Sequence, residues 1–196
     1  MLPSYFVIIG SLISVFGSLM YTVAIVKGKI KPHKVTLLLW SVIPFIAFFA
    51  QIKQGVGIQS LLTFVSGFMP LVNFVSSFLN EDANWEITKF DLMCGFLSIV
   101  GIILWLVTKV GNLAILFSII ADSLAAVPTV VKAYKHPETE LSWTWLTSAT
   151  GAALTLLTIN KWSFANSSFA IYVVTVTMIV FVLVQFRIGI RKNLTD

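Results

Sequence analysis

Long apolar runs separated by short polar segments are the feature of this sequence that most limits how it can fold. Of its 196 residues, 58% are hydrophobic and only 11% are charged. A soluble domain carries about 25% charged residues and cannot bury so much apolar surface. Because a backbone inside lipid must satisfy its hydrogen bonds internally, each run of about 20 apolar residues predicts a membrane-spanning helix. The sequence therefore predicts an all-α integral membrane protein.

The apolar runs define the expected helices. We expect seven transmembrane helices, over residues 4–26, 34–52, 55–79, 89–108, 111–134, 141–159 and 164–186. The segments between them are short, which predicts one compact bundle without a soluble domain.

The distribution of cations predicts the orientation of this bundle. With the N-terminus outside, ten of the 13 Lys and Arg residues fall on the inner side, and only Lys53, Lys109 and Lys161 fall outside. Such an excess is typical of cytoplasmic loops. We expect a protein integral to a bacterial plasma membrane, with the N-terminus outside and the C-terminus in the cytoplasm.

A pattern in the first third of the chain recurs about 105 residues later. In both places an apolar run leads into a basic loop and a second apolar run, and Pro32 to Trp40 repeats the spacing of Pro137 to Trp145. Both basic loops are expected inside, so the two copies insert in the same sense. The sequence predicts two parallel three-helix units, at 1–80 and 111–196, joined by a linker with the fourth helix at 81–110.

One segment of the second unit carries a family resemblance. The run Val127-Pro128-Thr129-Val130-Val131-Lys132, late in its first helix, resembles the motif of the PQ-loop (MtN3/saliva) superfamily. The 3+1+3 arrangement resembles the SWEET sugar transporters of that superfamily, and vitamin transporters of the PnuC type share the architecture. Thr129 stands where the motif has Gln, and Thr22 stands where the first unit would have Pro.

The resemblance implies roles for several residues. Phe164-Ala165-Asn166-Ser167-Ser168 is similar to a helix in which an Asn faces the central cavity, and the repeat puts Gln59 at the matching place. Pro128 and Pro44 resemble hinge prolines. Phe49 and Thr155 stand at the depth of the family's cavity Trp, while Trp40 and Trp145 lie near the inner loops, where an aromatic belt is expected.

Two further polar positions are candidates on physical grounds. Asp122 lies near the middle of the fifth helix, where an ionisable group costs at least a few kcal/mol unless it faces a cavity or a partner. It either pins two helices or serves as a cavity acid that binds hydroxyls or amines, or carries a coupling proton. Asn73 shares one face of the third helix with Gln59, Thr63 and Ser66. Such stripes line a cavity or join helices by hydrogen bonds.

These observations favour a SWEET-like transporter that moves a small neutral polar solute, sugar-like, across the membrane by alternating access. The alternatives are a nucleoside, vitamin or amino-acid transporter of the same fold, or a membrane receptor or scaffold. One cysteine and two histidines give no metal motif, and no catalytic arrangement is present. We expect no enzyme activity, cofactor or nucleic-acid partner; the partners are the solute and the bilayer, and homo-oligomerisation stays open.

Overall fold

A computed structural model describes residues 1–80, 86–108 and 111–188. Parts of the predicted linker, at 81–85 and 109–110, and the C-terminal residues 189–196 lie outside this description. The described part of the chain is all-helical, and its seven α-helices follow the predicted order. They are α1 (Phe6–Val26), α2 (Lys34–Lys53), α3 (Ser60–Ser76), α4 (Lys89–Thr108), α5 (Gly111–Lys135), α6 (Ser142–Leu157) and α7 (Phe164–Gln185), with a 3-10 turn, η1 (Pro137–Thr139), between α5 and α6.

Local chemistry sets several helix ends. Gly28 has φ +66°, and the amide of Lys29 donates to the carbonyl oxygen of Ala24 at 2.9 Å, so a left-handed glycine ends α1. Gly55 has φ +76°, and α3 begins only at Ser60, five residues later than the predicted start at residue 55. A chain that turns through a left-handed glycine cannot continue as a helix. At α7, the Ser163 hydroxyl accepts from the Asn166 amide and caps the first turn.

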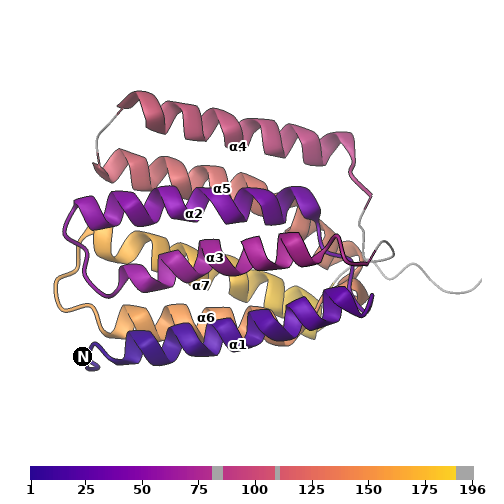
Figure 1. The fold of residues 1–196 in the computed structure, drawn as a ribbon, viewed down its shortest axis with the longest axis horizontal. Helices are drawn as coiled ribbons and strands as arrows, with labels where there is room; N and C mark the ends of the chain where they lie inside the picture. The colour runs from indigo at the N-terminus through magenta and orange to yellow at the C-terminus, as the bar shows by residue number, and fades with distance from the viewer. Residues whose placement is uncertain (81–85, 109–110, 189–196) are drawn as a thin grey trace, which may run out of the picture.

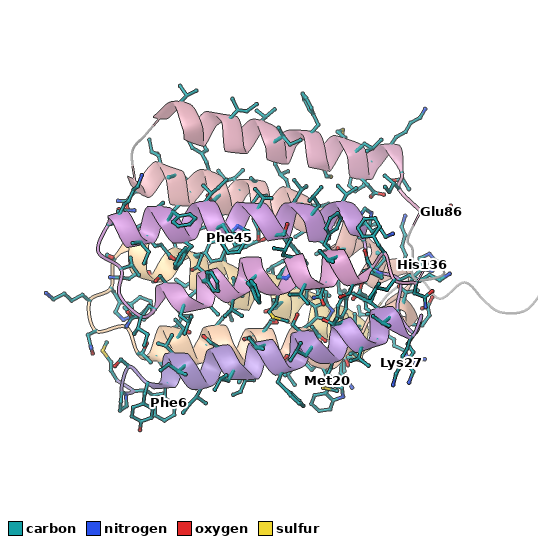
Figure 2. The ribbon with its side chains drawn as sticks, viewed as in Figure 1. Phe6, Met20, Lys27, Phe45, Glu86 and His136 are labelled. Atoms are coloured by element: carbon teal, nitrogen blue, oxygen red, sulfur yellow. The ribbon has the colours of Figure 1, made fainter. Side chains whose placement is uncertain are left out.

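Six helices form a closed ring, and α4 lies outside it. Around the ring, α1 packs on α3, α3 on α2, α2 on α5, α5 on α7, α7 on α6, and α6 back on α1. The helices run side by side along the long axis, and α4 lies at the edge of the bundle next to α5 (Figure 1). Figure 2 places Phe6 at one end of the bundle and Lys27 and His136 at the other. The loops after α1 and α5 therefore lie at the same end.

Within the described residues, four helices are long and apolar enough to cross a membrane, namely α1, α2, α5 and α7, and α3 is a shorter apolar helix. Large apolar side chains cover the outside of the bundle, as Phe16 and Val75 illustrate at 62% and 61% exposed. Small polar residues such as Ser14, Thr63 and Ser118 are buried instead. This distribution is that of a helical membrane protein, whose outer surface contacts hydrocarbon.

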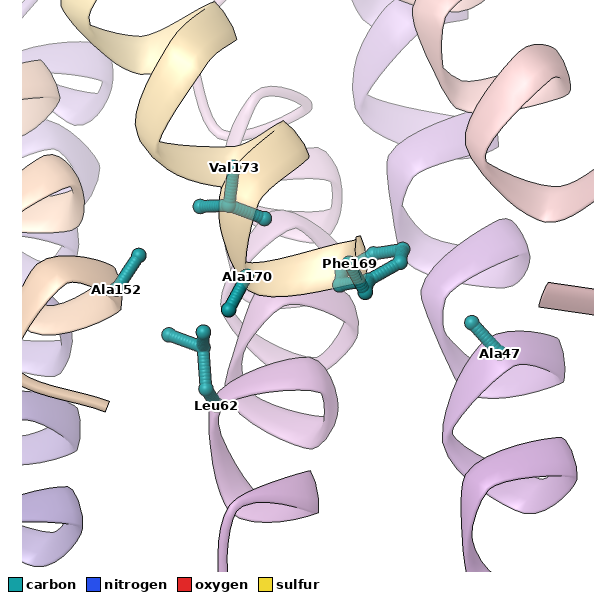
Figure 3. Close-up of a cluster of buried hydrophobic side chains, with 6 residues drawn as sticks. All are labelled: Ala47, Leu62, Ala152, Phe169, Ala170 and Val173. Atoms are coloured by element: carbon teal, nitrogen blue, oxygen red, sulfur yellow. The ribbon is translucent and has the colours of Figure 1, made fainter. Parts of the chain in front are cut away.

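Small residues allow the closest helix packing. Gly10 of α1 and Gly151 of α6 lie so close that a Cβ built on Gly10 would stand 2.8 Å from the Gly151 carbonyl oxygen. Between α2, α3, α6 and α7, the ring of Phe169 fills a cluster of small and aliphatic side chains (Figure 3), made of Ala47, Leu62, Ala152, Ala170 and Val173. Nearer the loop that follows α1, this apolar packing gives way to a cavity.

Candidate functional site

A central cavity of about 120 Å³ lies inside the ring of six helices. Each of the six contributes to its lining, for example Ser14 from α1, Pro44 from α2, Asn73 from α3, Ser148 from α6 and Val176 from α7. Hydroxyl groups, four Tyr and Trp rings, one imidazole and one carboxyl group share the wall with aliphatic side chains. A few fixed polar groups in an otherwise apolar pocket are typical of a small-molecule site.

The carboxyl group belongs to Asp122 of α5. Its side chain lines the cavity, only 5% of the residue is exposed, and Oδ1 has no hydrogen-bond partner among the described residues. The Tyr172 hydroxyl of α7 interacts with this carboxyl and also lies near Ser123 and Trp40. A buried polar atom without a partner costs free energy, so a ligand atom that supplied a hydrogen bond here would be stabilised.

Trp40 and Trp145 form an aromatic wall of the cavity. Their rings meet edge to face with centroids 5.8 Å apart, and Tyr21 approaches Trp145 in the same manner at 6.4 Å. Trp145 is only 7% exposed, and Trp40 directs Nε1 to the main-chain oxygen of Asp122 at 3.4 Å. The prediction that these two residues belong to an interfacial belt is therefore wrong, because both rings pack inward. The repeated Pro-to-Trp spacing was the signal that could have identified them as a pair.

A buried ionic cluster contacts two lining residues, Tyr21 and Trp145, at the end of the bundle that carries the basic loops. Lys132 of α5 forms an ion pair with Glu140, and both side chains are at most 1% exposed. Glu140 also accepts from the Tyr21 hydroxyl at 3.1 Å and from Nε1 of Trp145 at 3.3 Å, while Lys132 donates to the Lys31 carbonyl oxygen. A charge pair this deeply buried is stable only because further hydrogen bonds satisfy it. Sequence reasoning missed this cluster, since Lys132 was counted only as an inner-side cation and Glu140 as a loop residue.

His33 connects the cavity to α4. It precedes α2, lines the cavity, and places Nε2 3.0 Å from Oδ2 of Asp91 in the first turn of α4. Burial lowers the pKa of His33, although the nearby Asp91 carboxylate opposes that shift. The sequence assigned no role to His33, because nothing in it showed that α4 would return to this loop.

Of the eight residues predicted for the site and its hinges, three line the cavity: Asp122, Asn73 and Pro44. Asn73 uses its amide within the bundle, since Nδ2 donates to Ser18 Oγ at 3.0 Å and Oδ1 accepts from Thr22 Oγ1 at 2.6 Å. It therefore joins α3 to α1 while bordering the cavity.

The structure places the other five outside the cavity lining. Asn166 lies in the first turn of α7, where Nδ2 donates to the Lys161 carbonyl oxygen at 2.9 Å, and Gln59 precedes the first residue of α3. Phe49 is 60% exposed on the outer surface. Thr155 is buried but donates to Gly151 of its own helix, and Pro128 is buried in α5 next to Thr129, which does line the cavity.

Among the described residues, no group of three or more His, Cys, Asp or Glu side chains is arranged to hold a metal ion. No family model, curated protein or solved structure matches the chain. The candidate site is therefore defined by its geometry alone.

Proposed function

We propose that this protein is a membrane transporter that moves a small polar solute through the central cavity by alternating access. The observation that carries the proposal is that helices from both predicted units, 1–80 and 111–196, enclose one cavity with several polar groups in its wall. Transporters built from two repeats bind their solute at the interface between the repeats.

The helix contacts support the parallel repeat. Exchanging α1 with α5, α2 with α6 and α3 with α7 leaves the set of six ring contacts unchanged, and α4 lies outside the ring, packed mainly on α5. The carbonyl oxygen of Gly17 accepts from Thr144 of α6, and that of Asp122, 105 residues later, accepts from Trp40 of α2. Both bonds cross between the units. On this basis we propose the SWEET-like 3+1+3 arrangement, with its pseudo-twofold axis along the membrane normal.

Alternating access requires the two units to separate at one end at a time. At the end with the basic loops, they are joined by the bonds from Tyr21 to Glu140 and from Lys132 to Lys31, and by the Lys31 amide, which donates to the Thr139 carbonyl oxygen at 3.3 Å. Pro44 and Pro128 lie inside their helices, where each removes one backbone hydrogen bond, and they provide candidate hinges.

The size and chemistry of the cavity limit the solute. At about 120 Å³ it is similar to a protein cavity of roughly 150 Å³ that holds one benzene molecule. Hydroxyl groups of Ser14, Ser18 and Ser66 line it, and these suit a solute that carries hydroxyl groups. A small hydroxylated compound fits these limits better than a nucleoside or a disaccharide.

The test is uptake into liposomes that contain the purified protein, with radiolabelled polyols, hydroxylated amines, monosaccharides and nucleosides, with and without a proton gradient. Ser148 lines the cavity, whereas Thr150, two residues along α6, is exposed on the outside. We expect saturable uptake by the wild type, at least a tenfold loss of rate in Ser148→Leu, and unchanged uptake in Thr150→Leu. Equal uptake by these two variants would contradict a route through the cavity. Binding without flux would favour a receptor.

A further inference from the structure

Asp122 supplies the single carboxyl group in the described lining of the cavity. Only 5% of Asp122 is exposed. Its Oδ1 has no hydrogen-bond partner among the described residues, although Tyr172 lies beside the carboxyl group. The lining includes no Lys or Arg side chain from the described residues. Lys132, the cation at the end of the cavity, forms its ion pair with Glu140. A buried carboxylate needs a cation or a set of donors.

The aromatic residues around this carboxyl favour a cation. Trp40, Trp145, Tyr21 and Tyr172 all line the cavity, and the face of an aromatic ring carries partial negative charge. An ammonium group gains from such faces, most strongly from Trp, and the gain rises where water is excluded. A neutral solute could donate a hydrogen bond to the carboxyl group but would lack this attraction between opposite charges and to the ring faces.

We infer that the cavity binds a small hydroxylated organic ammonium compound, whose cationic nitrogen lies at Asp122 Oδ1 and whose hydroxyl groups contact the Ser and Thr side chains. This inference rests on the proposed function for its location and replaces the expectation of a neutral solute. It also disfavours amino acids, because their carboxylate would find no Lys or Arg in the described lining.

Matched compounds provide the test. Binding to the purified protein in lipid nanodiscs is measured by isothermal titration calorimetry at pH 7, where the amines are protonated. The pairs are ethanolamine and ethylene glycol, 2-amino-1,3-propanediol and glycerol, and choline and 3,3-dimethyl-1-butanol, each pair differing mainly in charge. Serine, compared with 2-amino-1,3-propanediol, adds a carboxylate.

We expect at least one ammonium compound to bind ten or more times more tightly than its neutral partner, and serine to bind more weakly than 2-amino-1,3-propanediol. Asp122→Asn is expected to abolish the preference. Glu138→Gln, which removes the same charge from a side chain that is 62% exposed, is expected to keep it. The wild-type comparison needs no variant, so it stands even where Asp122→Asn fails to fold.

Each result decides the question. If no ammonium compound binds more tightly than its partner, or if Asp122→Asn keeps the preference, the inference is wrong. Equilibrium binding and liposome flux are separate measurements. Transport of a neutral polyol without ammonium preference would overturn this inference alone, whereas ammonium binding without flux would overturn the transport proposal alone.

Discussion

Trp40 of α2 and Trp145 of α6 meet edge to face at the wall of the central cavity, with ring centroids 5.8 Å apart. They stand at equivalent positions of the repeated sequence pattern, eight residues after Pro32 and Pro137. Their partners differ, however. Trp145 donates to the Glu140 carboxylate at 3.3 Å, whereas Trp40 donates to a main-chain oxygen at 3.4 Å. Trp145 therefore stabilises a buried carboxylate, whereas Trp40 satisfies a main-chain carbonyl oxygen.

Trp145→Phe is expected to lower the free energy of unfolding by about 1.5–3 kcal/mol, because a buried carboxylate loses one of its donors. The measurement is chemical unfolding in mixed micelles, followed by circular dichroism. Trp143→Phe is the matched control on the same helix; its ring is 60% exposed, so we expect a change within about 0.5 kcal/mol. Equal effects of the two variants would show that the bond to Glu140 contributes nothing.

The ion pair of Lys132 and Glu140 gives a second prediction. Removing one partner leaves a buried charge uncompensated, so Lys132→Met and Glu140→Gln are each expected to cost about 3–5 kcal/mol. The double variant should cost less than the sum of the two, as measured in a double-mutant cycle by the same unfolding assay. Glu138→Gln controls for the loss of an acid from the same loop. Additive effects would mean that the two side chains do not interact.

His33 predicts how stability depends on pH. Because burial puts its folded-state pKa below the unfolded value of about 6.5, the unfolded chain takes up a proton first as the pH falls. The stability that neutral His33 provides is therefore present above pH 6.5 and is lost as the pH falls below it. We expect the unfolding temperature to drop between pH 7.5 and pH 5.5, and to drop less in His33→Gln.

The His136→Gln variant, which removes the other histidine of the chain, tests whether the drop in unfolding temperature comes from His33. A drop that persists in His33→Gln and disappears in His136→Gln would contradict the prediction. Loss of the contact between His33 and Asp91 would also loosen α4 from the start of α2, since α4 otherwise packs mainly on α5.

The number, order and approximate bounds of the helices were predictable, because long apolar runs allow few other structures. The predicted helices at 89–108 and 111–134 agree with α4 and α5 to within one residue. The burial of Asp122 was also predictable, since an ionisable group in an apolar run must avoid lipid.

The direction in which each side chain points was less predictable. Helix faces that contact lipid and faces that contact other helices are both apolar, so the periodicity that reveals the core of a soluble protein is weak. Phe49 was expected in the cavity and lies on the outer surface of the bundle, whereas Trp40 and Trp145 were expected in an interfacial aromatic belt and line the cavity. Asn166 donates to the Lys161 carbonyl oxygen at the start of its helix. The sequence pattern does not indicate how far the start of that helix lies from the cavity.

The predicted orientation can be tested with single cysteines, because Cys94 is the only cysteine of the chain. In a Cys94→Ser background, Lys29→Cys marks the loop after α1 and Trp162→Cys marks the loop between α6 and α7. Both positions are exposed, and the two loops lie at opposite ends of the bundle (Figure 1). With the N-terminus outside, a membrane-impermeant maleimide should label Trp162→Cys in intact cells. Lys29→Cys should react only after permeabilisation, since the basic loops are retained on the cytoplasmic side. The reverse pattern would invert the topology, and labelling of both in intact cells would mean that the two loops do not lie on opposite sides of a membrane.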